Sequence, residues 1–174
     1  DGVIHLAFKH DLALAGGDFM GAVNADLRAV EAIGEALAGS KKPFVNTTGT
    51  MLLAHSVQGR AGTEDDIGQP GGNPRTASES ISLAYAERGV RTSIVRLAPT
   101  VHSSLDHAGF IPMLIANARK NGFVPYVGDG QNRWPAVHTL DAARLYRLAL
   151  EAAPPGFRAH AAADEGVAFR AIAE

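Results

Sequence analysis

The chain alternates between short apolar runs and longer amphipathic segments. The nearly continuous apolar run at residues 3–8 predicts a strand covered on both faces, as in a parallel sheet, and further strands are predicted at residues 43–48 and 92–97. Apolar residues at helical spacing predict helices at residues 19–37, 76–88 and 140–150. The order strand–helix–strand–helix–strand indicates an α/β fold with right-handed crossovers.

Local signals refine this pattern. Residues 59–74 are rich in Gly, Pro and acidic side chains and predict an exposed loop. The spacing of Thr76 and Glu79 predicts a capping box at the start of the second helix. After Pro99 the pattern loosens, and Pro112 predicts the first turn of a further helix. Two more strands are predicted at residues 123–127 and 157–163.

Composition narrows the class of protein. The chain has 174 residues, of which 46% are hydrophobic and 20% charged, as expected for one globular domain. Its net charge of −2, with acids and bases mixed, favours neither nucleic acid nor an anionic membrane as a partner. The chain has no cysteine, which excludes disulfides and cysteine-ligated zinc and fits a cytoplasmic location. The histidine spacings predict no metal site.

The two ends of the sequence are abrupt. Asp1 leads almost at once into an apolar run, and Glu174 ends the chain inside a helical pattern. Complete domains usually have a few poorly ordered residues at each end. We therefore expect a fragment, a processed product or the ordered part of a longer chain.

Four segments in order resemble a known family, the atypical and extended short-chain dehydrogenase/reductases of the NAD-dependent epimerase/dehydratase type. The segments are Asp1–Ala7, Asn46–Thr50, Val95–His102 and Val137–Ala143. The resemblance implies a Rossmann-like, doubly wound parallel sheet with a small substrate-binding region. Residues 1–101 would form the C-terminal part of the NAD(P)-binding domain. Residues 102–174 would form the substrate-binding region, within a single structural unit.

The chain departs from the family in two places. The glycine-rich turn that holds the cofactor pyrophosphate has no counterpart here, which implies that the first strands of the fold are missing. If Glu79 is used as the anchor, Arg75 stands at the lysine and Gly71 at the tyrosine of the family's Tyr-x-x-x-Lys motif. Arginine is a poor proton donor. Enzymatic activity is therefore left open by the sequence, and no residue is predicted as the proton donor.

By resemblance, the family's site maps onto three groups of residues. The catalytic pair would be Thr48, which polarises a substrate carbonyl, and Arg75. The cofactor would lie against His5, Leu6, Ala7, Phe8, Thr47, Pro99, Thr100, Val101 and His102. The substrate would contact Thr50, Asp129, Arg133 and Trp134.

Structural roles compete with each of these functional ones. His5 would then bond to backbone, the threonines to amides of their own turn, and Arg75 to solvent. Thr50 is an alternative to Thr48 as the polarising hydroxyl, because the turn does not fix the alignment. Trp134 would anchor its loop.

The resemblance implies an NAD(P)-dependent oxidoreductase or epimerase-like protein, using NADP or NAD on a small organic substrate of carbonyl or sugar-like character. The alternative is a non-catalytic NAD(P)-binding sensor or scaffold. A third interpretation is that the fragment is no functional unit by itself. A small molecule is the expected partner, without nucleic acid or membrane, and a homodimer is expected by analogy with extended family members.

Overall fold

The helices and strands of the computed structural model follow the predicted α/β order. The structure describes residues 1–54, 56–69 and 71–174. Its strands are β1 (Val3–His5), β2 (Pro43–Gly49), β3 (Arg91–Leu97), β4 (Thr100–His102), β5 (Arg133–His138), β6 (Phe157–Ala161) and β7 (Asp164–Ala168). Its α-helices are α1 (Phe19–Leu37), α2 (Thr76–Ala84), α3 (Phe110–Asn121), α4 (Thr139–Ala152) and α5 (Phe169–Ala173). Two short helical turns, η1 (Asp11–Ala15) and η2 (Thr50–Leu53), follow β1 and β2.

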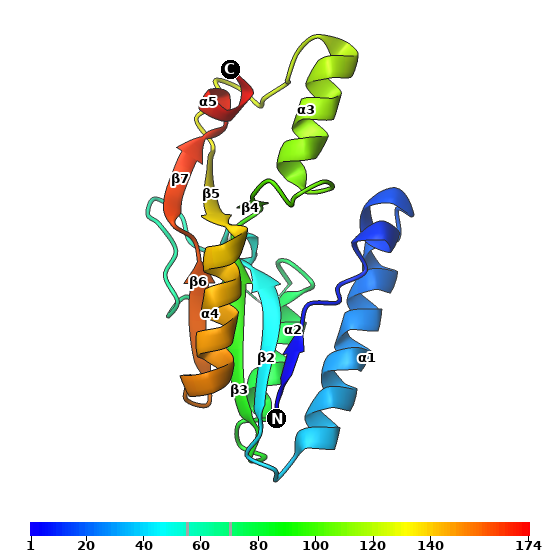
Figure 1. Ribbon diagram of the computed structural model, residues 1–174, viewed down its shortest axis with the longest axis vertical. Coiled ribbons are helices and arrows are strands. Elements are labelled where there is room, and N and C mark those ends of the chain that lie inside the picture. The colour runs from blue at the N-terminus through cyan, green and yellow to red at the C-terminus, as the bar shows by residue number, and fades with distance from the viewer. Residues whose placement is uncertain (55, 70) are drawn as a thin grey trace.

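The main sheet is parallel throughout, in the order β1-β2-β3-β6. Helix α4 covers one face of it, and α1 and α2 lie on the other (Figure 1). Alternation along β2 divides the core accordingly, because successive side chains of a strand point to opposite faces. Phe44 packs in a cluster with Val30 and Tyr85, whereas Val45 packs in a cluster with Tyr146.

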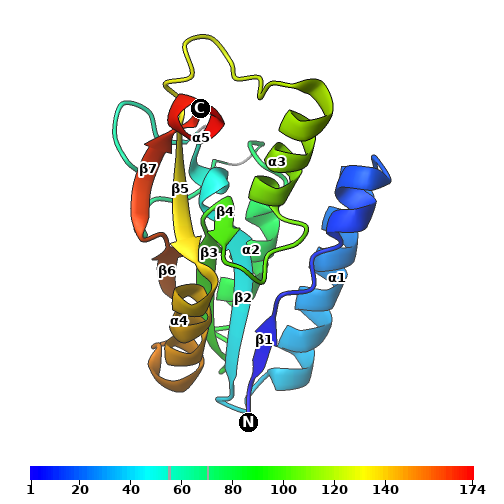
Figure 2. The ribbon, with the colours of Figure 1, turned by 45° about the horizontal axis from the view of Figure 1, so that its top comes forward.

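A second, three-stranded sheet has the order β4-β5-β7. Strand β4 pairs with β5 in parallel and β5 pairs with β7 antiparallel. This small sheet and α3 lie beyond the carboxyl ends of β2 and β3 (Figures 1 and 2). None of the described helices is long and apolar enough to cross a membrane.

Three predictions about chain segments are wrong. The strand predicted at residues 123–127 is a loop in which Phe123 and Val127 are 62% and 85% exposed, and the strand of this region is β5 instead. The capping box is absent, since Arg75 occupies the N-cap of α2 without a side-chain cap. The first strand also ends early, at His5, where Leu6 turns to solvent with 58% exposure. The loop predicted at 59–74 is irregular at every described residue, and residue 70 lies outside the described residues.

Glu79 does not cap α2 because its carboxylate is buried at the centre of an ion-pair network. Arg96, which is fully buried, donates from Nε to Glu79 Oε2 at 3.0 Å, and Arg158 Nε donates to Oε1 at 3.1 Å. Arg96 also donates to the carbonyl oxygens of Thr63 and Asp66. The network therefore joins α2, β3, β6 and the loop over residues 59–69.

Removing Glu79 should destabilise the fold strongly. In Glu79→Ala two arginines lose their buried counter-charge, and breaking a buried pair costs about 3–5 kcal/mol. Glu87→Ala, at an exposed position just after the same helix, should change the free energy of unfolding by less than about 0.5 kcal/mol. Urea denaturation measures both variants. Equal stabilities would contradict the structural role of the network.

Candidate functional site

A cleft lies where the carboxyl ends of β1, β2 and β3 meet the first turn of α3. Its volume is about 640 Å³. In open parallel sheets, ligands bind in the crevice outside the carboxyl ends of the strands. The start of α1 and all of α3 extend beyond these strand ends (Figures 1 and 2). The cleft is therefore the candidate functional site.

Eight of the predicted site residues line this cleft, from four separate parts of the chain. They are His5, Leu6, Phe8, Thr47, Thr48, Arg75, Pro99 and Val101. Their convergence follows from the parallel sheet, since the segments after β1, β2 and β3 all leave at one edge. The remaining seven are not among the lining residues: Ala7, Thr50, Thr100, His102, Asp129, Arg133 and Trp134.

Three of those seven residues make contacts elsewhere in the structure. Asp129 accepts a hydrogen bond from the backbone of its own loop, and Arg133 donates to the Gly166 carbonyl. Trp134 packs edge-on against Phe110 and Phe169, at centroid distances of 5.4 and 4.9 Å. Trp134 thus anchors α3 and α5, and it reaches the cleft only through Phe110, which does line it.

A buried histidine–aspartate pair forms part of the cleft wall. His5 Nε2 and Asp26 Oδ1 lie 2.9 Å apart, and the two residues are 7% and 4% exposed. His5 therefore bonds to a side chain of α1, which the sequence did not predict. Asp26 was missed altogether, although it shares its helix face with the buried Ala22 and Val30. A single acid on an otherwise apolar face was the available signal.

Arg75 also lines the cleft. Its guanidinium lies 4.1 Å from the centre of the Phe8 ring, and its Nη2 donates to the Thr47 carbonyl at 3.1 Å. Burial lowers the pKa of Arg75, against the opposing charge of Asp26. Burial works to raise the pKa of Asp26, but the hydrogen bond from His5 and the charge of Arg75 outweigh it, so this pKa lies below its usual value. Asp26 is therefore ionised near neutral pH.

The two threonines at the end of β2 point to opposite faces of the sheet. Thr48 is 2% exposed and its hydroxyl donates to Glu79 Oε2 at 3.2 Å. The Thr47 hydroxyl is half-buried and lies 2.8 Å from the hydroxyl of Tyr146 on α4. Burial raises the pKa of Tyr146 to about 12, so this phenol stays protonated.

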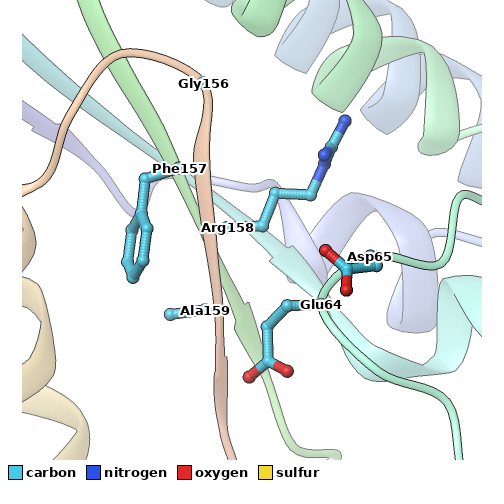
Figure 3. A pocket seen from close by; sticks show the side chains of 6 residues that line it. All are labelled: Glu64, Asp65, Gly156, Phe157, Arg158 and Ala159. Carbon is cyan, nitrogen blue, oxygen red and sulfur yellow. The ribbon is translucent and has the colours of Figure 1, made fainter.

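A second cavity, of about 440 Å³, lies along the first residues of β6 and is lined by Glu64, Asp65 and residues 156–159. Phe157 and Arg158 leave the strand on opposite sides there (Figure 3). Arg158 is engaged with Glu79, and no predicted site residue lines this cavity. Among the described residues, no three His, Asp or Glu side chains gather as metal ligands.

A parallel sheet with helices on both faces and a cleft at its carboxyl edge is a Rossmann-like architecture. Comparison with known families agrees: the model of the NAD dependent epimerase/dehydratase family matches residues 2–159. The chain belongs to this family.

Two curated relatives come from yeasts. The uncharacterized protein C2A9.02 of Schizosaccharomyces pombe is 47% identical over 174 residues, and the uncharacterized protein YLL056C of Saccharomyces cerevisiae is 40% identical over 173 residues. Each alignment covers 99% of this chain and 56% of the relative. The chain thus spans about half the length of these relatives.

Solved structures with the same fold are more distant in sequence. A dTDP-glucose 4,6-dehydratase double mutant from Streptomyces venezuelae, with NAD and DAU bound, has a TM-score of 0.78 at 19% identity, over 99% of this chain and 55% of the other. A UDP-glucuronic acid 4-epimerase from Bacillus cereus, in complex with UDP-glucuronic acid and NAD, has a TM-score of 0.71 at 17% identity, over 88% and 50%. These likenesses establish the shared fold.

The Asp26 carboxylate should stabilise the fold in a pH-dependent way. Because its folded pKa is lowered, its contribution is present above the unfolded pKa, about 3.9, and is lost as the pH falls through the folded value. Asp26→Asn should cost about 1–3 kcal/mol at neutral pH and less at about pH 3. Urea denaturation at both pH values measures this, with the exposed Asp65→Asn as control. A cost that does not change with pH would contradict the ionised pair.

Proposed function

We propose that this chain forms part of an NAD(P)-dependent oxidoreductase or epimerase-like enzyme that acts on a small organic substrate of carbonyl or sugar-like character. Residues 1–101 would complete the NAD(P)-binding domain and residues 102–174 the substrate-binding region. The observation that carries the proposal is the convergence of His5, Thr48 and Arg75 on one cleft at the carboxyl edge of the sheet. We further propose a cytoplasmic, homodimeric protein, by analogy with the family.

Relatives of the same fold support the choice of cofactor. The dehydratase and the epimerase compared above are described with NAD bound. Family membership, which rests on residues 2–159, points the same way. The choice between NAD and NADP depends on residues after the family's second strand, for which this chain has no counterpart.

The cleft wall fits a hydroxylated ligand such as the ribose of a nicotinamide cofactor. Arg75 Nε is buried and finds no hydrogen-bond partner among the described residues, although its Nη2 is engaged. A guanidinium has five N–H donors, and those that face the cleft would donate to a ribose hydroxyl. His5, Leu6 and Phe8 would lie against the nicotinamide, with Pro99 and Val101 on the opposite side.

When bound, the cofactor supplies hydride transfer. The protein's own part is to position the substrate and to polarise its reacting carbonyl. We assign the polarising role to Thr48, whose bond to Glu79 is long for a hydroxyl donor at 3.2 Å, so a carbonyl oxygen can compete for its proton. Glu79, fixed by two arginines, would hold the Thr48 side chain in place until then.

A second candidate function is a non-catalytic NAD(P)-binding sensor or scaffold. It is favoured by Gly71 and Arg75, which stand where the family has its tyrosine and lysine. Both functions require cofactor binding. Only the enzyme consumes NADPH or NADH when a carbonyl substrate is added.

Cofactor binding should depend on Arg75. The protein is purified as its gene encodes it, its intact mass is measured, and NADPH and NADH are titrated by calorimetry. Arg75→Ala should weaken binding about tenfold, as expected for the loss of one hydrogen bond from a charged group. Arg28→Ala, at an exposed position on α1, should bind like the wild type. Equal affinities of the two variants would contradict the ribose contact, and absence of binding to the wild type would contradict both candidate functions.

The two hydroxyls of β2 should differ in their effect on turnover. Thr48→Val should lower kcat by about 10²–10³-fold, the usual effect of removing a donor to a developing oxyanion, with little change in KM. Thr47→Val, which loses a bond to Tyr146, should lower kcat less than about tenfold. Steady-state rates are measured on the fastest substrate among aldehydes, ketones and nucleotide sugars. The reverse order would assign the polarising role to Thr47.

A further inference from the structure

The wall of the cleft is mostly apolar. Aromatic and aliphatic side chains from five segments make up most of it, including Phe8, Phe19, Met51, Val101, Phe110 and Met113. Several are exposed around the opening, with Phe19 39%, Met51 51% and Met113 44% exposed. Exposed large apolar side chains gathered at one concave site mark a binding surface.

Charge is scarce in the same wall. Among the described lining residues, the titratable side chains are His5, His10, Asp26 and Arg75. Arg75 is the one permanent cation of this set; its guanidinium lies against the Phe8 ring and donates to the Thr47 carbonyl, and in the proposed function its other N–H groups bind the cofactor ribose. A diphosphate group needs cationic or N–H donors that are free to bind it.

The helix that enters the cleft offers no anion site either. A helix N-terminus ordinarily attracts anions through its free N–H groups and its dipole. At the start of α3, the Asp106 carboxylate already accepts from the backbone N–H of Gly109 at 2.7 Å. Pro112 removes a further N–H from the first turn. A phosphate placed there would meet the Asp106 charge.

We propose that the substrate is an uncharged, largely apolar aldehyde or ketone, or the corresponding alcohol, and that it is not a nucleotide-linked sugar. This deepens the proposed function and rests on it for the reaction itself. In the reduction, a hydride from the nicotinamide forms the new C–H bond, the C=O π pair moves to oxygen, and the oxygen takes one proton from water. The products are an alcohol and the oxidised cofactor.

The wall accounts for this specificity. The apolar body of the ligand lies against Phe110, Met113 and Met51, and its carbonyl points to the hydroxyl of Thr48. Removing apolar surface from water drives such binding in proportion to the area covered. A sugar diphosphate would instead lose its hydration against methionine and phenylalanine without compensation.

The test uses binding and turnover separately, on the protein as its gene encodes it. Acetophenone, benzaldehyde and 2-decanone are titrated by calorimetry beside UDP-glucose, and each is then assayed for NADPH and NADH consumption. At least one of the uncharged carbonyl compounds should bind and be reduced, and UDP-glucose should do neither.

A matched pair of variants locates the binding. Met113 and Ile115 are neighbours on α3 with 44% and 45% exposure, but Met113 lines the cleft and Ile115 is not among its lining residues. Met113→Lys should weaken carbonyl binding about tenfold, because it replaces apolar contact with a charge. Ile115→Lys should leave the affinity unchanged and shows that an added charge on α3 is tolerated.

The outcomes separate this inference from the proposed function. Binding of UDP-glucose in preference to all three carbonyl compounds overturns the substrate class and leaves the oxidoreductase standing. Failure of all four ligands to bind also overturns it, whatever the result with NADPH. Carbonyl binding that is sensitive to Met113→Lys but is not followed by cofactor consumption supports the ligand class and contradicts the enzyme.

Discussion

The buried carboxylate of Glu79 is the constraint on which the rest of the structure depends. A charge in the interior must be compensated, and here it is met by Arg96 from β3 and Arg158 from β6. Arg96 in turn holds two carbonyls of the loop over residues 59–69. One ion therefore fixes the helix, two strands and the loop relative to one another. The hydroxyl of Thr48, a residue that lines the cleft, donates to the same carboxylate. The network therefore also fixes the position of a side chain in the cleft wall.

Hydrogen bonds between β2 and α2 connect this ion-pair network to the cleft. Asn46 donates to Ser78 and Ser82, and Thr48 donates to Glu79, so three polar contacts along one face of β2 set the register of α2. With that register fixed, the residue just before the helix must lie at the carboxyl edge of the sheet. This residue is Arg75, so the residue that the resemblance puts at the family's lysine position lines the cleft, although Gly71 and not a tyrosine stands four positions earlier.

Elements with a strong hydrophobic pattern could be predicted from the sequence. Runs buried on both faces gave β2 and β3, and helical spacing gave α1 and α4, because burial leaves a strong pattern. The predictions failed where a single side-chain or strand contact determines the local structure. The spacing of Thr76 and Glu79 is compatible with a cap, yet compensation of Arg96 takes Glu79 into the interior. Asp26 is one polar residue on an apolar face, and its partner His5 lies 21 positions earlier, a pairing that no local signal specifies. Residues 123–127 are a short apolar run like that of a strand, but they pair with no described strand.

Different parts of this molecule determine the position of the cleft and the chemistry of its walls. The parallel sheet fixes where its carboxyl edge and the cleft beside it lie, and structures at 17–19% identity share this fold. The chemistry of the walls comes from segments outside the sheet, namely the turn after β1, the turn after β2 and the first turn of α3. Such segments vary while the scaffold is retained. Here they supply Phe8, Met51 and Phe110, and the Asp106 carboxylate, just before α3, accepts the backbone N–H of Gly109. In the proposed function the substrate lies against these walls, so their polarity decides which substrates bind.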